Sequence, residues 1–229
     1  MRLFASVRPP AAVLEHLAHA LDGVAPASLD GGPPPLRWVP PEQRHVTLAF
    51  YGEVPDGALE DLAGALGAVA TGTAPLRVQL AGAGVFSGAT LWVGLRVVDG
   101  DERALVRLMG EVAAAGEGIS RLEPRDRHRA HLTVARLSAR EQRERADRRR
   151  RSGRGDRRPG RPPAVDLPAL AHALSVYRGP EWTAREVELV ESHLGAGRSG
   201  GPLHEVRARL PLAGGVTSAT RQAPPEGAR

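Results

Sequence analysis

Cysteine is missing from all 229 residues of the chain. Its absence excludes disulfide bonds, thiolate metal sites and a cysteine nucleophile. Apolar runs are short as well: none approaches the ~20 residues that a membrane span needs, and the first residues lack the apolar segment of a secretory signal peptide. We therefore expect a protein of a reducing compartment, the cytoplasm, with no membrane partner.

Lysine is also missing, so all 31 basic side chains are arginine. The formal net charge of +5 is unevenly distributed. Residues 140–161 contain eleven arginines and four acidic residues, a local charge of 11 − 4 = +7, which leaves 5 − 7 = −2 for the rest of the chain. The segment is either an arm that attracts RNA or a solvated, partly helical insertion, and we favour the insertion.

The remaining pattern predicts a mixed fold with a substantial core. Helices are expected from Pro9–Pro10 onward, from Asp56 to about Ala70 and from Asp101 onward, each with apolar residues at helical spacing. Strands are expected at 1–7, 36–39, 45–51, 76–80, 90–98, 129–136, 173–177, 185–194 and 203–210, with a glycine-rich connection around Phe86. This order of elements predicts an α+β or α/β fold, in one large domain or two closely packed lobes.

Two of these strands repeat one motif: His45-Val-Thr47 and His131-Leu-Thr133, separated by 86 residues. Side chains alternate along a strand, so each histidine shares a face with its threonine, opposite an apolar face that is expected to be buried. By the same alternation Arg129 lies on the face of His131. Arg136 lies on the opposite face unless the strand bends.

Paired imidazoles suit a reaction that removes one proton and delivers another, because a histidine pKa near ~6.5 allows a neutral base and a protonated acid to coexist near neutral pH. Phosphodiester transfer is such a reaction. The two threonine hydroxyls can donate hydrogen bonds to the phosphate oxygens on which charge develops. A half-buried histidine satisfied by a neighbouring hydroxyl is the alternative for either motif alone, but two matched copies favour a catalytic pair.

Two His-x-Thr strands in a chain of this size resemble the two-histidine (2H) phosphoesterase superfamily. More closely, RWVPPEQ (Arg37–Gln43) before HVTLAFYGEV, then HLTVAR and YRGPEWTAREVELVESHLG (Tyr177–Gly195), are similar to bacterial RNA 2′,3′-cyclic phosphodiesterases, also called 2′-5′ RNA ligases. The resemblance spans roughly residues 1–137 and 166–212. The arginine-rich segment departs from it.

The resemblance implies a bilobal, pseudo-symmetric α+β fold in which two antiparallel sheets line a central cleft and helices lie outside. It implies hydrolysis of an RNA 2′,3′-cyclic phosphate to a 2′-phosphomonoester, possible reversal to 2′-5′ ligation, and no metal or nucleotide cofactor. We accordingly expect one domain at 1–212, with an insertion at about 138–163 and a disordered tail at 213–229, acting as a monomer on RNA ends.

The implied catalytic residues are His45 and His131, with Thr47 and Thr133 as phosphate ligands. Symmetry does not distinguish acid from base; we assign His131 as the base that activates water and His45 as the acid. Arg136, at the family's arginine position, and Arg129, by its parity, are further phosphate ligands. Their alternative is an ordinary surface role.

Tyr51 shares the face of His45 and is the candidate for stacking on a base, although burial in the core is the usual fate of such a ring. His16 and His19 lie three residues apart on a helix, but no suitable carboxylate accompanies them, so no metal site is expected. His193 is a weaker candidate for lining the cleft. A non-catalytic module that binds RNA ends on the same fold is the alternative function.

Overall fold

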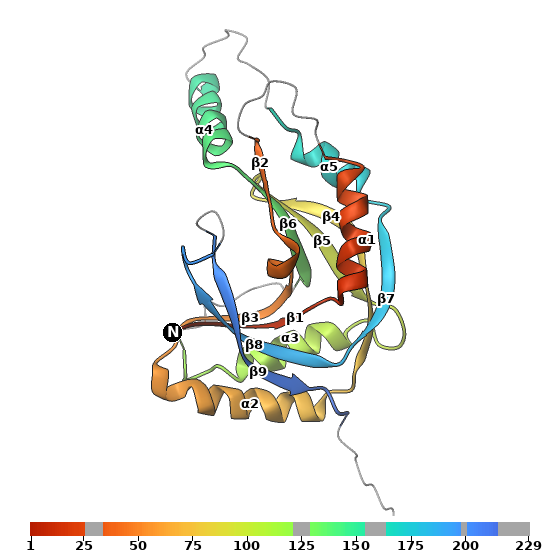
Figure 1. Ribbon diagram of the computed structural model, residues 1–229, viewed down its shortest axis with the longest axis vertical. Coiled ribbons are helices and arrows are strands. Elements are labelled where there is room, and N and C mark those ends of the chain that lie inside the picture. Colours follow the sequence, from red (N-terminus) through yellow and green to blue (C-terminus); the bar gives the residue numbers. More distant parts are fainter. Residues whose placement is uncertain (26–33, 121–128, 154–163, 198–200, 215–229) are drawn as a thin grey trace, which may run out of the picture.

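The computed structural model describes residues 1–25, 34–120, 129–153, 164–197 and 201–214 (Figure 1). The strands are β1 (Arg2–Val7), β2 (Leu36–Trp38), β3 (Val46–Glu53), β4 (Leu76–Phe86), β5 (Thr90–Val97), β6 (His131–Leu137), β7 (Arg178–Ala184), β8 (Glu186–His193) and β9 (Leu203–Pro211). The helices are α1 (Ala11–Asp22), α2 (Leu59–Gly72), α3 (Ala104–Ala114), α4 (Ala139–Gly153) and α5 (Leu167–Ala173). Short 3₁₀ turns lie at Pro41–Gln43 and Asp56–Ala58.

The nine strands form one curled antiparallel sheet in the order β7-β4-β5-β6-β3-β1-β8-β9, with β2 beside β6. Two groups of strands are extensively paired, one from β7 to β6 and one from β3 to β9. They join at β3 and β6 through a single residue pair, Val46 with Leu132. The α+β fold is confirmed, and the two expected sheets are the two lobes of this continuous sheet.

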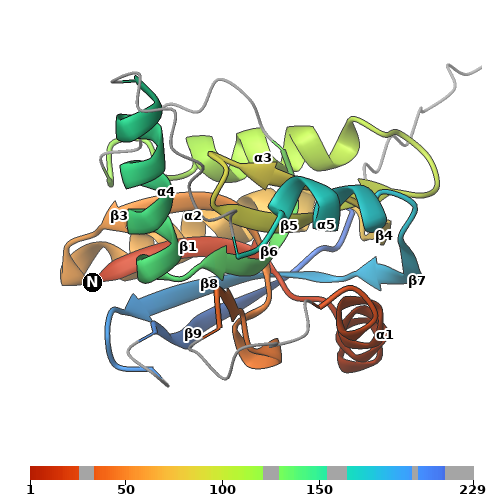
Figure 2. The same cartoon turned by 90° about the horizontal axis from the view of Figure 1, so that it is seen from above.

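Helices cover each lobe on its outer side (Figure 2). Helices α2 and α3 pack against β8, β9 and β3, whereas α1 packs against β7 and α5 against β4 and β5. The apolar stripe expected for α1 is confirmed, because all four of its residues are buried: Val13, Leu14, Leu17 and Leu21. None of the described helices has the length and apolar character needed to cross a membrane.

Both histidine strands contain a β-bulge at the same place in the motif. In β3 the pairing with β1 skips Leu48, since Thr47 faces Ser6 and Ala49 faces Ala5. In β6 the pairing with β5 skips Val134 between Thr133 and Ala135. An extra residue reverses the alternation of every side chain that follows it. Position 50 and position 136 therefore point to the face opposite from the one that strict alternation predicts.

Several expected boundaries are wrong. The glycine-rich connection is strand: β4 continues to Phe86, and a three-residue turn leads to Thr90. A strand at 173–177 is not formed, because residues up to Ala173 belong to α5, which the Asp166 carboxylate caps by accepting a hydrogen bond from the Ala169 amide. Asp56 starts a 3₁₀ turn and does not cap α2.

The fold extends slightly past residue 212. Leu212 is buried, and the amides of Ala213 and Gly214 donate hydrogen bonds to the carbonyls of Ala70 and Thr73. The rest of the expected tail, 215–229, lies outside the described residues, as does the second half of the arginine-rich segment. Its first half is α4.

Candidate active site

A cavity of about 440 Å³ lies where the two lobes meet. It brings together five of the predicted site residues, His45, Thr47, His131, Thr133 and Arg136. The remaining lining residues come from β1, β3, β8, β9 and the segments beside them: Arg2, Phe4, Val39, Gln43, Phe50, Ser192, Leu194, Pro202 and His204. The two motifs thus face one cavity, as their common pattern indicated.

Arg136 reaches this cavity because of the bulge at Val134. Without it, Arg136 would share the buried face of Leu132. Its guanidinium lies near that of Arg37, which is paired with it across β2 and β6. Burial, and secondarily the charge of Arg37, lower the Arg136 pKa from its usual value. A cation held close to another cation is well suited to bind an anion.

The stacking role expected for Tyr51 is wrong, and the bulge at Leu48 is the reason. Tyr51 is 1% exposed and its ring packs on Gly116, where an added Cβ would lie 2.6 Å from it. Its hydroxyl donates a 2.7 Å hydrogen bond to the Val112 carbonyl, and burial raises its pKa. Phe50 takes its place on the cavity wall, with the Arg2 guanidinium 4.7 Å from the ring centre.

Both catalytic candidates are oriented by the same backbone contact. The Nδ1 atom of His45 lies 2.8 Å from the Gln43 carbonyl oxygen, and that of His131 lies 2.8 Å from the Arg129 carbonyl oxygen. A carbonyl can only accept, so the proton is on Nδ1 in each ring. This fixes the tautomer in which Nε2 of a neutral imidazole is the basic atom.

His45 lies among rings. It stacks on Phe4 with 4.7 Å between ring centres, and the edge of His204 approaches it at 5.1 Å. The pKa of His45 is lowered to about 4, mainly by burial and to a lesser extent by the nearby His204, Arg8 and Arg136, while the contact with the Gln43 carbonyl partly opposes this shift. The pKa of His204 is also lowered, mainly by burial. His45 is consequently a neutral imidazole in the ligand-free protein at pH 7.

His131 has different neighbours. Phe86 approaches it edge to face at 4.8 Å, and Trp92 does so at 6.2 Å. Trp92 lies flat across β4 because Gly84 is opposite it; a Cβ there would be 2.3 Å from the indole. Gly84, in a segment that was expected to be a loop, therefore makes room for the Trp92 ring behind His131.

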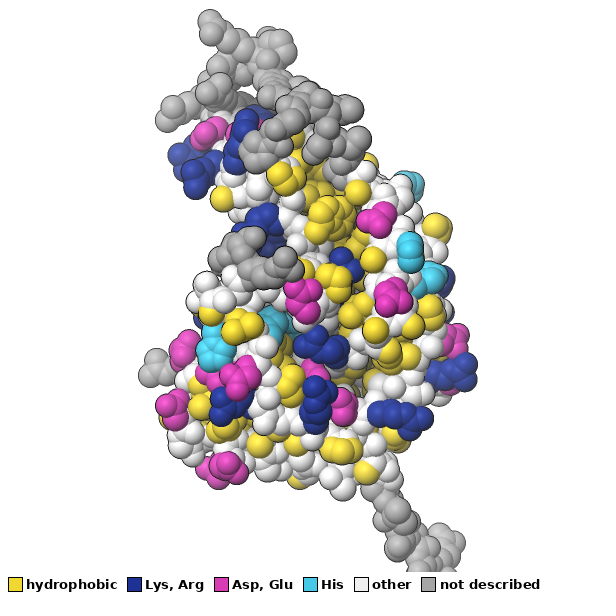
Figure 3. Space-filling view, viewed as in Figure 1, with side chains coloured by type: hydrophobic (Ala, Val, Ile, Leu, Met, Phe, Trp, Pro, Cys, Tyr) yellow, Lys and Arg dark blue, Asp and Glu magenta, His cyan; other side chains and the backbone are white. Residues whose placement is uncertain are grey.

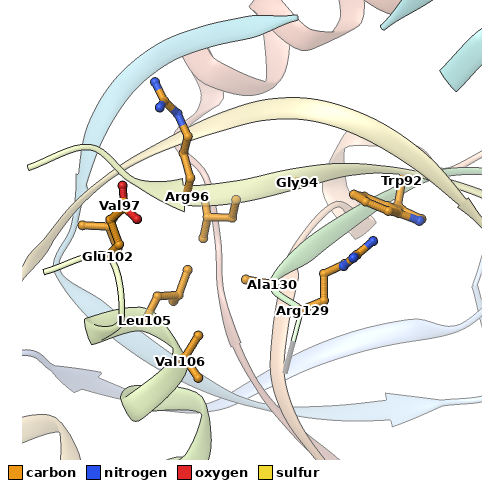
Figure 4. Close-up of a pocket in the computed structure, with 10 residues that line it drawn as sticks. Trp92, Gly94, Arg96, Val97, Glu102, Leu105, Val106, Arg129 and Ala130 are labelled. Atoms are coloured by element: carbon orange, nitrogen blue, oxygen red, sulfur yellow. The ribbon is translucent and has the colours of Figure 1, made fainter. Parts of the chain in front are cut away.

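The Arg129 side chain does not line the histidine cavity. Its guanidinium lies 5.2 Å from the ring centre of Trp92, in a neighbouring pocket lined mainly by β5 and α3 (Figure 4). The prediction failed because Arg129 precedes β6, where strand alternation no longer holds. Its contribution to the site is the carbonyl that orients His131.

Other histidines lie elsewhere. His16 contacts the Tyr177 hydroxyl at 3.2 Å. His193, the weaker cleft candidate, lies within 4.8 Å of the carboxylates of Glu191 and Glu205, outside the cavity lining. Arg207 bridges the same two carboxylates, at 3.1 Å and 3.5 Å, so this group is already charge-compensated by arginine.

Sequence reasoning missed Phe4, Phe50 and His204 as cavity residues. Phe50 had a signal: each motif continues with two apolar residues, Leu48-Ala49 and Val134-Ala135, and two successive buried residues break strict alternation. Phe4 and His204 had none, because they come from β1, which pairs with β3 over a long sequence separation, and from β9, which is joined to β1 only through β8.

Paired imidazoles, two hydroxyls and an arginine thus surround one cavity, the arrangement that the resemblance to two-histidine phosphoesterases implied. Residues 7–92 match the family model of LigT-like phosphoesterases. An RNA 2′,3′-cyclic phosphodiesterase of Geobacillus stearothermophilus is 37% identical over 103 residues, which cover 43% of this chain and 32% of that protein. One of Thermus thermophilus is 28% identical over 224 residues, which cover 93% and 91% of the two chains.

A solved structure agrees with these matches. The crystal structure of TT0787 of Thermus thermophilus superposes with a TM-score of 0.64 at 25% identity, covering 93% of this chain and 99% of that one. The family model, the relatives and the solved structure together confirm the resemblance found in the sequence. The chain is therefore similar to LigT-like phosphoesterases in the sequence of residues 7–92 and to TT0787 in its fold.

Proposed function

We propose that the protein is an RNA 2′,3′-cyclic phosphodiesterase that produces 2′-phosphomonoester ends by acid–base catalysis between His45 and His131. The observation that carries the proposal is that two imidazoles, each with its Nδ1 proton held by a backbone carbonyl, line one cavity together with Thr47 and Thr133. The relatives named for this activity support the same substrate class.

In this mechanism His131 is the base. Its Nε2 takes a proton from water, and the water oxygen attacks phosphorus. The bond from phosphorus to O3′ breaks, and His45 gives its proton to O3′. Thr47, Thr133 and Arg136 hold the non-bridging oxygens as their negative charge increases. The same step with an RNA 5′-hydroxyl in place of water, in which His131 takes the hydroxyl proton and His45 again protonates O3′, forms a 2′-5′ linkage.

The acid role of His45 requires a bound phosphate, because its pKa is about 4 in the empty cavity. One negative charge at about 4 Å contributes roughly 4 kcal/mol at an effective dielectric constant near 20, or about 3 pKa units. A bound substrate phosphate therefore raises the His45 pKa toward neutrality. His45 then carries its proton when the substrate is present.

The location and the assembly are part of the proposal. We place the enzyme in the cytoplasm because cysteine is absent, and we expect a monomer, since the described cavity is built from one chain.

The test is an assay on a short RNA that ends in a 2′,3′-cyclic phosphate, in the presence of EDTA. We expect conversion to the 2′-phosphate, identified by its mobility and its resistance to an enzyme specific for 3′-phosphates. A 3′-phosphate product would overturn the proposed direction of ring opening. Binding of the RNA without any turnover would instead support the non-catalytic RNA-end-binding module.

A further inference from the structure

Arg37 and Arg136 are paired directly across β2 and β6. Residues paired in this way project to the same face, and like charges so placed destabilise a sheet. Both residues are exposed, and among the described residues neither makes an ion pair with an acidic side chain. Arg136 lines the histidine cavity, so Arg37 extends its positive charge along β2.

Helix α4, which follows β6, contains a buried acidic residue. Glu141 is 3% exposed, and it accepts bonds from Arg145 and Arg148 at 2.9 Å and 3.0 Å. Arg145 also donates to the Gly88 carbonyl, in the turn between β4 and β5. The helix is therefore tied by Arg145 to the turn between β4 and β5.

The turn that contacts α4 is adjacent to Arg136. Thr90, which follows the turn, is paired with Arg136, and the Leu137 amide donates to the Ala89 carbonyl. The Arg149 guanidinium lies beside Gly88, with Nη2 3.7 Å from the position that a Cβ would take there. Arg149 is thus held at the same end of β6 as Arg136.

Three arginines of α4 have no ion pair within the described part of the chain. Arg140, Arg145 and Arg148 are neutralised by Glu141 and Glu144. Arg143, Arg149 and Arg150, by contrast, are exposed and unpaired. Figure 3 shows dark blue side chains around α4 and at the edge of the notch below it.

We propose that these residues form an arginine track that binds the phosphate backbone of an RNA strand whose cyclic end lies in the histidine cavity. The track is Arg136, Arg37, Arg149, Arg143 and Arg150. It rests on the proposed function and deepens it: the substrate class is an oligonucleotide, and a nucleoside 2′,3′-cyclic phosphate is a poorer substrate.

An RNA backbone fits the track better than an acidic peptide does. Arg149 lies beside the turn that leads to the Arg136 end of β6, and Arg143 and Arg150 belong to the same helix, so one chain of phosphates could contact both the cavity and α4. Guanidinium groups form paired hydrogen bonds with phosphate oxygens and stay charged at all relevant pH values.

The test compares a triple variant, Arg143→Gln with Arg149→Gln and Arg150→Gln, and the single variant Arg37→Gln with the wild-type protein. The matched control is Arg185→Gln, which removes an exposed, unpaired arginine between β7 and β8, outside the cavity lining. Hydrolysis is measured on a ten-nucleotide RNA with a cyclic end and on cytidine 2′,3′-cyclic phosphate. Affinity is measured separately with the same RNA ending in a 3′-phosphate.

We expect the triple variant to lose about tenfold in affinity for the RNA, with a loss of kcat/KM on the RNA at least about fivefold greater than on the mononucleotide. The slope of log affinity against log salt concentration should decrease by about 0.7 for each lost phosphate contact. Arg37→Gln should show a smaller change in the same direction. The control should match the wild type.

Equal losses on both substrates, or losses no greater than those of Arg185→Gln, would overturn the track. The affinity measurement keeps this result separate from the proposed function. Suppose that the protein hydrolyses neither substrate, but that the triple variant still binds RNA more weakly and with a reduced salt slope. That result would support RNA binding by the arginine track and would contradict the proposed phosphodiesterase activity.

Discussion

The two halves of the cavity share a construction and differ in their electrostatics. On each side a histidine is held through Nδ1 by the carbonyl two residues earlier, and a bulge follows the threonine. The side chain that the bulge delivers to the cavity is Phe50 in one half and Arg136 in the other. The carbonyl contact and the bulge, which both halves share, position two equivalent imidazoles. The residues that differ, Phe50 and Arg136, give the two imidazoles different surroundings.

The surroundings of His45 strongly affect its protonation. It is enclosed by Phe4 and His204 and lies near two arginines, so burial and positive charge both disfavour its protonated form. His131 instead has Phe86 and Trp92 as neighbours. A symmetric scaffold can therefore give two identical motifs different surroundings, so that the proton affinity of His45 is lowered without any change in the motif itself.

The largest effect should come from removing either histidine. We expect His45→Ala and His131→Ala each to lower kcat by about 10²–10⁴-fold, because each supplies a proton transfer. A substrate with sulfur in place of O3′ distinguishes them, since a thiolate leaves without a proton donor. His45→Ala should recover most of its rate on that substrate, and His131→Ala should not.

Circular dichroism should show that both variants remain folded. Recovery of His131→Ala instead of His45→Ala would reverse the acid and base assignment. Near-normal rates for either variant on the natural ester would remove that histidine from the mechanism.

A smaller effect is expected where the halves differ, at the residues after the bulges. Arg136→Gln should lower kcat/KM by about 10²-fold, as the loss of a charged ligand to the developing phosphate charge does. Arg136→Lys should restore only part of it, because an ammonium lacks the planar fork. Phe50→Leu, the matched change in the other half, should lower kcat/KM by less than about tenfold. Equal losses of kcat/KM at the two positions would mean that the two halves of the cavity do not differ in their contribution to catalysis.

The smallest change is a shift in the titration of His45, followed by NMR of its ring. We expect a midpoint of about 4 in the free protein, and a rise of at least about one unit when inorganic phosphate or a 2′-nucleotide binds.

The lowered His45 pKa also affects stability, because in the unfolded chain the His45 ring takes up a proton below about pH 6.5. Stability from the neutral ring is therefore complete above pH 6.5 and lost as the pH falls toward 4. A His45 midpoint near 6.5 without ligand would contradict the burial argument.

The sequence predicted the motifs, the fold class and three of the helices, since these depend on local patterns. The stripes of α1 and α3 are buried as expected. Errors occurred where distant contacts decide. Tyr51 was misplaced, and strict alternation pointed Arg136 away from the cavity that it lines, because the register of β3 and β6 depends on their neighbours in the sheet. The contacts of α4 were equally hard to predict, because Arg145 donates to the carbonyls of Gly88 and Val165, which are distant in the sequence.

The bulges have a consequence for how such a site can change over time. Because the reversal of alternation lies after the threonine, the histidine and threonine keep their register whichever side chain stands at position 50 or 136. Those two positions can be exchanged for others without disturbing the proton-transfer groups. A single scaffold can in this way acquire new ligand preferences through one substitution on either strand.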